Sequence, residues 1–183
     1  MLGLGSLLAW PWPTRGIDWQ PRYVAEAWRW WTAGFVHWSV LHLAGNLLAL
    51  VLVAALGVRA AAGPHLALAW FAAWPLTHVA LLLVPGLAHY GGLSGVLHAG
   101  VAVAALALAV QARGRRRAIG AAILAGMMVK LLLEEPWGPP LRHVPGWDIA
   151  LAPAAHAAGT LAGLLCAAVA LAWPARTAPR MQR

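Results

Sequence analysis

Three polar residues, each within an apolar segment, are the positions of this chain most suited to chemistry. Asn46 ends the stretch HLAGN, Ser94 lies in GLSG and His156 begins HAAGT. Amide, hydroxyl and imidazole groups are costly to bury in hydrocarbon, so we expect these three to face one another in a polar pocket. Serine and histidine are the minimum set for nucleophilic acyl transfer, and an amide can donate to an oxyanion. The pattern therefore predicts a protease that acts inside a membrane.

The composition is that of a membrane protein. Of the 183 residues, 62% are hydrophobic and 10% are charged, and the mean hydropathy is +0.71. Soluble domains average about 25% charged residues. We therefore expect a single polytopic domain over residues 1–183. Cys166 is the only cysteine, so a disulfide framework is excluded and a small buried hydrophobe is expected there.

The net charge of +8 could suggest nucleic-acid binding, but the distribution of charge argues against it. All five acidic residues fall in the segments 14–31 and 134–148, and the densest basic run, 113–117, joins two apolar segments. Basic residues beside membrane spans mark the cytoplasmic face. We therefore expect the lipid bilayer, and no nucleic acid, as a partner. The tail gives the same orientation through Arg176, Arg180 and Arg183.

Long apolar segments predict an all-α, polytopic bundle of six transmembrane helices. A span needs about 20 residues, with about 17–25 the usual range. Residues 1–13 are apolar but too short to span alone. A truncated first helix, a helix extended by the following loop and a wrongly chosen start codon all stay open for them. The other five expected spans are 32–57, 65–84, 93–111, 118–133 and 149–173.

This topology places the polar groups of three helices at one depth below the outer surface. Asn46 lies about a dozen residues inside its helix, and Ser94 begins its helix from the outer end. His156 follows Asp148 by eight residues, about 12 Å at 1.5 Å per residue. Polar residues with no common function would not be expected to lie at the same depth in three different helices. A shared pocket is therefore predicted.

Glycines around Ser94 favour a catalytic role for the serine. Gly92 and Gly95 permit close approach of a substrate backbone. A helix start also offers free N–H groups and a positive dipole end to a developing oxyanion. The alternative is a serine that only caps its helix or bonds to the previous turn.

The helix of His156 carries a face of small residues, because Gly159 and Gly163 are four apart. Such a face lets two membrane helices pack closely, as a serine–histidine hydrogen bond requires. The alternative is a buried histidine that bonds a backbone carbonyl. His98, one turn after Ser94, is expected to lie near His156 and to orient it.

His42 and Asn46 lie one turn apart on one helical face. Asn46 is predicted to donate to the oxyanion of a tetrahedral intermediate, and interhelical hydrogen bonding is the alternative. For His37, a structural hydrogen bond and a role in admitting water are equally open. Arg29 could anchor the first loop, with Glu26 as a possible partner.

These residues, in this order, resemble the rhomboid intramembrane serine proteases. The match runs from Trp28-Arg29 and Trp31-Thr32 through His37, His42 and Asn46 to the GLSG stretch, and ends with His156, Gly159 and Gly163. The resemblance implies a rhomboid-like fold and a Ser94–His156 dyad without a third acid. It also implies an oxyanion site formed by His42, Asn46 and the Ser94 main chain, and a structural role for Arg29.

Within that family the chain is most similar to the rhombosortase branch. Many rhomboids have tyrosine at the position of His98, and the chain is compact. The resemblance implies a bacterial inner-membrane protease whose active site opens to the periplasmic side. Its substrates would be membrane proteins with a single or C-terminal transmembrane segment, in particular exported proteins with a C-terminal Gly-Gly tail. No cofactor and no metal are expected.

Three other functions stay open. A catalytically inactive rhomboid-like protein would bind membrane helices without cutting them. A metal or haem protein could use His37, His42, His98 and His156, although the sequence has no HExxH motif. A serine–lysine peptidase could use Lys130, which lies near the outer end of its predicted helix.

Overall fold

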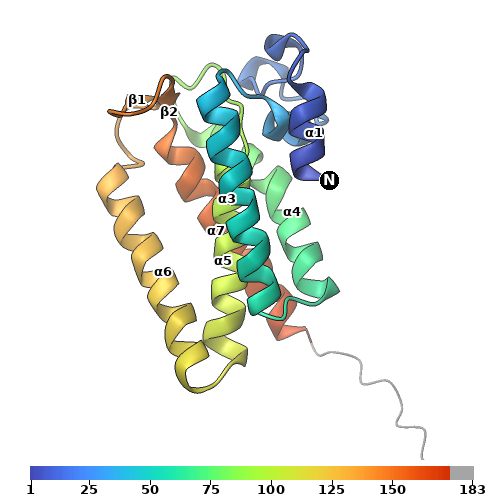
Figure 1. Cartoon of the computed structure of the whole chain (residues 1–183). Coiled ribbons are helices and arrows are strands. Elements are labelled where there is room, and N and C mark those ends of the chain that lie inside the picture. The colour runs from blue at the N-terminus through green and yellow to red at the C-terminus, as the bar shows by residue number, and fades with distance from the viewer. Residues whose placement is uncertain (174–183) are drawn as a thin grey trace, which may run out of the picture.

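The computed structural model describes residues 1–173 and is almost entirely helical (Figure 1). The only sheet in this range is a hairpin of two strands with two residues each, β1 (Arg142–His143) and β2 (Ala150–Leu151). The basic tail with Arg176, Arg180 and Arg183 lies outside the described residues. The helices are α1 (Leu2–Ala9), α2 (Arg29–Thr32), α3 (Val40–Arg59), α4 (Pro64–Ala80), α5 (Ser94–Gln111), α6 (Gly114–Glu134) and α7 (Pro153–Ala172), with short 3₁₀ turns at Thr14–Gly16, Pro21–Tyr23, Ala33–Phe35 and Leu81–Leu83.

Within residues 1–173, four helices are long and apolar enough to cross a membrane. They are α3, α4 with its 3₁₀ extension to Leu83, α5 and α7, each of 18 to 20 residues. Helix α6 has 21 residues but begins with Arg115, Arg116 and Arg117 and carries Lys130 and Glu134 near its end. The chain is therefore an integral membrane protein built around an apolar helical bundle.

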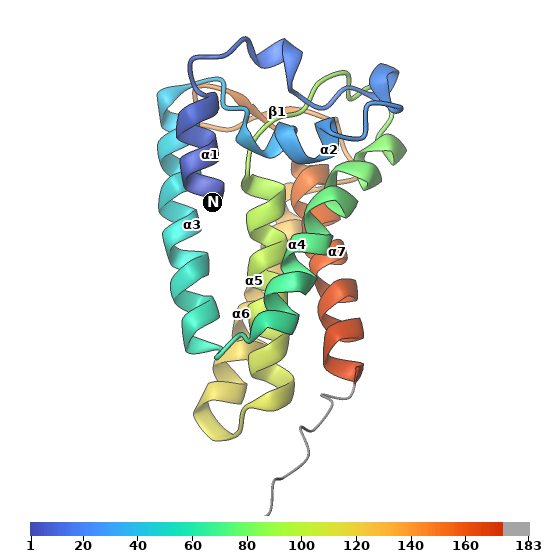
Figure 2. The same cartoon turned by 90° about the vertical axis from the view of Figure 1, so that its right-hand side faces the viewer.

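The predicted count of six transmembrane helices is not confirmed. Residues 1–13 form only α1, whose eight residues extend about 12 Å at 1.5 Å per residue, well short of a membrane. This helix lies beside the upper part of α3 (Figure 2). A Cβ atom at Gly5 would meet the Phe35 ring, and one at Gly3 would meet the Leu50 side chain. Helix α1 therefore packs against the bundle and does not cross the membrane.

The predicted span 32–57 is wrong at its start. Helix α3 begins at Val40, where Ser39 Oγ accepts a hydrogen bond from the His42 backbone N–H at 3.0 Å. This cap satisfies one free N–H group of the first turn. His37 therefore precedes the helix, in an extended segment. Residues 149–152 likewise lie before α7 and form part of the hairpin.

Helix α5 lies at the centre, where it contacts α3, α4, α6 and α7 (Figure 1). It is the most buried of the four apolar helices. Its contact with α7 is made by small residues: Gly159 faces the Gly95 carbonyl, and Gly163 faces the Ala99 carbonyl. A Cβ atom at either α7 glycine would collide with the α5 backbone. This close packing brings the first turns of α5 and α7 together at one end of the bundle.

Candidate active site

Ser94 is the first residue of α5, at the end of the bundle that carries the hairpin. The chain enters the helix through Gly92, whose φ of +122° is a conformation that other residues rarely adopt. A Cβ atom there would also lie 2.6 Å from His42 Nε2. Glycine at this position therefore allows both the turn into α5 and the close approach of α3 to residues 89–94, called the serine segment below.

His42 and Asn46 project from α3 toward the turn at Gly92, and both are buried. His42 Nδ1 has no hydrogen-bond partner among the described residues. The ring of His37 lies 4.7 Å from that of His42. His37 Nδ1 is 3.1 Å from the Phe35 carbonyl, and because a carbonyl only accepts, Nδ1 carries the proton. Burial lowers the pKa of His37 below its ordinary value, so this histidine is neutral at pH 7.

His156 is the fourth residue of α7, and its ring is held from two sides. On one side it stacks on the ring of His98, with centroids 4.3 Å apart and planes 14° from parallel. His98 Nδ1 donates to the Ser94 carbonyl at 2.7 Å, which fixes the stacking partner on α5. On the other side, Nδ1 of His156 is 2.8 Å from the Glu134 carboxylate. The predicted proximity of His98 to His156 is thus observed.

Ser94, His42 and His156 line one cavity of about 20 Å³, room for roughly one water molecule. Within residues 1–173, the structure contains no hydrogen bond between Ser94 Oγ and His156. The nearest side-chain partner of Ser94 Oγ is the Tyr90 hydroxyl, 3.4 Å away. The three side chains thus share one small cavity, without a direct bond between Ser94 and His156. The remaining lining residues are Trp38, His89, Tyr90, Gly91, Leu141, Ile149, Ala150, Leu151 and Ala152.

The hairpin covers this cavity and is fastened to α3. Ser39 Oγ donates to Asp148 Oδ1 at 2.7 Å. The Trp147 ring lies against α3 so closely that a Cβ atom at Gly45 would be 2.9 Å from it. Residues 149–152 of this cover line the same cavity as Ser94.

The first loop supports the serine segment from the other side. Trp19 and Tyr90 exchange two backbone hydrogen bonds, of 2.9 and 3.0 Å. Next to Trp19, the buried Asp18 carboxylate accepts from Gln20 at 2.6 Å and bonds His89 at 2.7 Å. Burial raises the pKa of the Tyr90 phenol, which therefore keeps its proton and acts as a donor.

Arg29 anchors this loop. Its Nη1 donates to the Asp18 carbonyl at 2.9 Å, and its Nε donates to Glu26 at 2.6 Å. The sequence suggested Arg29 and Glu26 but gave no reason to single out Asp18 or Tyr90, because neither lies in an apolar span or a recognisable motif.

Glu134 is the main residue that the sequence reasoning missed. The resemblance implied a dyad without an acid, whereas the structure places a carboxylate on His156. Its only signal in the sequence is the four-residue spacing from Lys130, which is typical of a helical ion pair. The pairing with α7 depends on how two separate helices pack.

Lys130 does not contact Ser94 within the described residues. Its Nζ lies 2.6 Å from Glu134 Oε1 and 3.5 Å from His156 Nδ1. The histidines proposed for a metal centre form two separate ring pairs, His37 with His42 and His98 with His156. Within residues 1–173, no group of three or more His, Cys, Asp or Glu side chains has the geometry to hold a metal ion.

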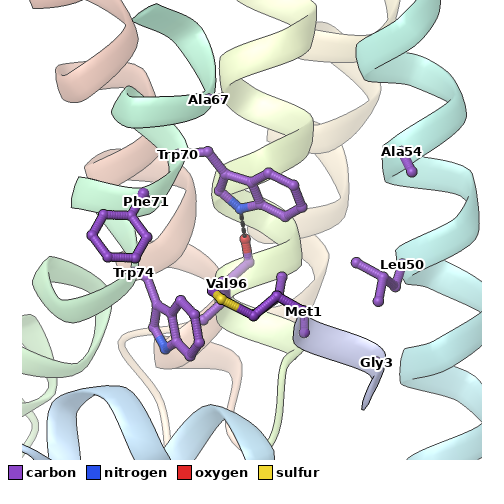
Figure 3. A pocket seen from close by; sticks show the side chains of 10 residues that line it. Met1, Gly3, Leu50, Ala54, Ala67, Trp70, Phe71, Trp74 and Val96 are labelled. Atoms are coloured by element: carbon purple, nitrogen blue, oxygen red, sulfur yellow. Dashed lines mark hydrogen bonds between the residues drawn. The ribbon is translucent and has the colours of Figure 1, made fainter. Parts of the chain in front are cut away.

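A larger hollow of about 310 Å³ lies between α1, α3, α4 and α5 (Figure 3). Its walls are apolar and aromatic, and the indole N–H of Trp70 is already bonded to the Val96 carbonyl at 2.7 Å. It contains no nucleophilic or acidic side chain, so it is not a candidate for chemistry. Its lining residues are Met1, Leu2, Gly3, Leu50, Ala54, Ala67, Trp70, Phe71, Trp74 and Val96.

The chain matches the model of a known protein family. The family model of the Rhomboid domain matches residues 24–173, from the middle of the first loop to the end of α7. No curated protein sequence matches the chain.

Proposed function

Because the chain belongs to the rhomboid family of intramembrane proteases, we propose that it is an intramembrane serine endopeptidase with Ser94 as nucleophile and His156 as general base. One observation carries the proposal: the first residue of α5 and the imidazole of α7 line the same small cavity. The packing of Gly159 on Gly95 supports it, because it brings the backbones of the two helices that carry these residues into contact.

The proposed reaction has two halves. In the first, Ser94 Oγ passes its proton to His156 Nε2 and attacks the peptide carbonyl carbon, and the C–N bond then breaks as His156 returns the proton to the leaving amine. In the second, His156 takes a proton from water, the hydroxide attacks the acyl ester, and the ester C–O bond breaks. The proton returns to Ser94 Oγ, so the enzyme is regenerated.

His42 and Asn46 are proposed to stabilise the tetrahedral oxyanion. Both lie beside Gly92, which leads into the first turn of α5. The free backbone N–H of Ser94 and the positive end of the α5 dipole add to the same site. Loss of one such donor costs about 3–4 kcal/mol in the transition state.

The proposed substrate is a membrane protein with a single or C-terminal transmembrane segment, cut in a manner like rhombosortase. A Gly-Gly sequence suits such a substrate, because glycine lets a substrate helix unwind and expose its backbone to Ser94. Exported proteins with a C-terminal Gly-Gly tail are therefore the preferred candidates.

The proposed location is the bacterial inner membrane, with the site facing the periplasm. Arg113 in the connection between α5 and α6, and Arg115, Arg116 and Arg117 in the first turn of α6, lie at the end of the bundle opposite the hairpin (Figure 1). Arginines favour the cytoplasmic side, which puts the cavity near the other surface.

The test is cleavage of a co-expressed protein with a Gly-Gly tail, followed by mass spectrometry of its new C-terminus. Wild-type protein should release the truncated product, and Ser94→Ala should not. The competing function is an inactive helix-binding protein, which the absence of a Ser94–His156 hydrogen bond within residues 1–173 would suit. A fluorophosphonate that labels wild type but not Ser94→Ala excludes it; no labelling of folded wild type would reject the protease proposal.

A further inference from the structure

The imidazole of His156 is bonded to a carboxylate that the chain supplies from a different helix. Glu134 is the last residue of α6, and its Oε2 lies 2.8 Å from His156 Nδ1. The His156 side chain is 8% exposed and that of Glu134 is 23% exposed, so the contact is largely sheltered from water. A carboxylate only accepts, and Nδ1 therefore carries the proton in this bond.

We propose, on the basis of the function proposed above, that Glu134 is a positioning residue that completes a Ser94–His156–Glu134 triad. With Nδ1–H directed at Glu134, the lone pair of neutral His156 is on Nε2, the nitrogen needed to take the Ser94 proton. When His156 becomes an imidazolium, the nearby negative charge stabilises it. These are the two contributions of the acid in serine–histidine–acid sites.

The carboxylate is itself held in place. Lys130 Nζ bonds Glu134 Oε1 at 2.6 Å, one turn earlier on α6. Arg142 Nη1 donates to the backbone carbonyl of Glu134 at 2.7 Å, which fixes the end of the helix. One carboxylate oxygen thus faces Lys130 and the other faces His156.

Lys130 also opposes the charge of His156. Its Nζ lies 3.5 Å from Nδ1. Since Nδ1–H is already directed at Glu134, this is a contact between two donors rather than a hydrogen bond. A positive charge at that distance disfavours the imidazolium that Glu134 favours. The two residues should therefore shift the pH dependence of His156 in opposite directions.

A purely structural ion pair between Lys130 and Glu134 would not require a bond from Glu134 to His156. Glu134 and Lys130 are spaced as an ordinary i, i+4 pair on a partly exposed surface, where such pairs contribute little to stability. A positioning role requires the second carboxylate oxygen to bond the buried imidazole, as Oε2 of Glu134 does.

The experiment measures labelling of purified protein in detergent by a fluorescent fluorophosphonate, which reports Ser94 reactivity without a known substrate. Glu134→Gln keeps the shape of the side chain but removes its charge. We expect the limiting labelling rate to fall about 100-fold, with the half-saturating probe concentration unchanged. Loss of a fully buried triad acid costs more, about 10⁴-fold, but Glu134 is partly exposed and His98 also holds the ring. Glu134→Asp should recover part of the rate.

The matched control is Glu135→Gln. Glu135 is the next carboxylate, is 56% exposed and bonds Arg142 at 3.2 Å rather than His156. This variant should label like wild type. Thermal unfolding of each variant in detergent separates loss of folding from loss of reactivity.

The pH profile gives a readout that a structural role would not move. Glu134→Gln should shift the acidic limb of labelling to lower pH, because the imidazolium loses a favourable charge. Lys130→Met should shift the same limb to higher pH. The titratable and charged groups that face His156 or line its cavity are His98 from α5, Lys130 and Glu134 from α6, His42 from α3, and His89 and Tyr90 from the serine segment.

The outcomes distinguish the two proposals. Folded wild type that does not label at Ser94 would reject the protease function. Wild type that labels while folded Glu134→Gln labels at the same rate, with the same pH profile, would reject the triad alone. The triad is supported if Glu134→Gln labels more slowly than wild type, and if Glu134→Gln and Lys130→Met shift the acidic limb of the pH profile in opposite directions.

Discussion

The ring of His98 lies almost parallel to the ring of His156, 4.3 Å away, while its Nδ1 bonds the carbonyl of Ser94. A single side chain on α5 thus contacts both proposed partners of the reaction. A flat ring at this position can set the plane of the proposed general base.

Replacement of His98 should separate stacking from hydrogen bonding. His98→Tyr keeps a flat ring against His156 and should retain labelling within about threefold. His98→Ala removes the ring and should lower the rate roughly 10-fold or more, because His156 gains freedom to rotate. The check is the fluorophosphonate labelling rate, compared at equal folded fraction. Equal rates for both variants would contradict a positioning role for the ring.

Asn46→Ala should reduce proteolysis about 100- to 1,000-fold, since one oxyanion donor is lost. Folding should be nearly unchanged, because Asn46 makes no side-chain hydrogen bond within the described residues. Cleavage of the Gly-Gly-tailed protein is the measurement, with Leu48→Ala, an exposed residue of the same helix, as control. If Asn46→Ala cuts normally but unfolds at lower temperature, the residue serves helix packing instead.

Gly159→Ala should destabilise the protein and inactivate it together. The added methyl group meets the Gly95 backbone on α5, which cannot move like a flexible side chain. Overpacking of this kind costs roughly 1–3 kcal/mol and pushes His156 away from Ser94. Gly126→Ala on α6 is the control, because nothing lies within 4 Å of its Cβ position, and it should be neutral or slightly stabilising. Thermal unfolding with activity at low temperature tests both.

Ser39→Ala should make the cover over the cavity easier to open. It removes the 2.7 Å bond to Asp148, an exposed hydrogen bond worth about 0.5–1.5 kcal/mol. It also removes the α3 cap on the His42 N–H, so Asp148→Asn, which leaves that cap in place, is the matched variant. If opening limits access, turnover of the Gly-Gly-tailed protein should rise about two- to tenfold. Asp148→Asn weakens the same contact and should act in the same direction. A fall in rate for both variants, with folding intact, would show that the hairpin bears on substrate binding instead.

The elements that the sequence predicted well depend on local signals. The apolar segments 65–84 and 93–111 closely match α4 with its extension and α5, because about 20 apolar residues in succession have few alternatives to a membrane helix. The placement of Ser94 at a helix start also followed from its neighbouring glycines. The faces of Gly95 and Gly159 could be read from small-residue spacing, and they do meet.

The errors in the predicted spans occur where hydrophobicity does not show whether an apolar segment is helical or where its helix begins. Residues 1–13 and 32–39 contain no Asp, Glu, Lys or Arg, yet one ends after eight helical residues and the other turns into an extended segment before Val40. The Ser39 cap, rather than hydropathy, sets the start of α3.

The sequence by itself determined a membrane bundle in which serine, histidine and asparagine lie near one depth, because span length and small-residue spacing are local properties of the chain. The tertiary structure alone decided that Glu134 bonds His156 and that Asp18 supports the first loop. Residues 134 and 156 belong to different helices, and 18 and 89 are far apart along the chain. No periodicity connects such pairs; they meet only when close packing between helices selects one mutual orientation.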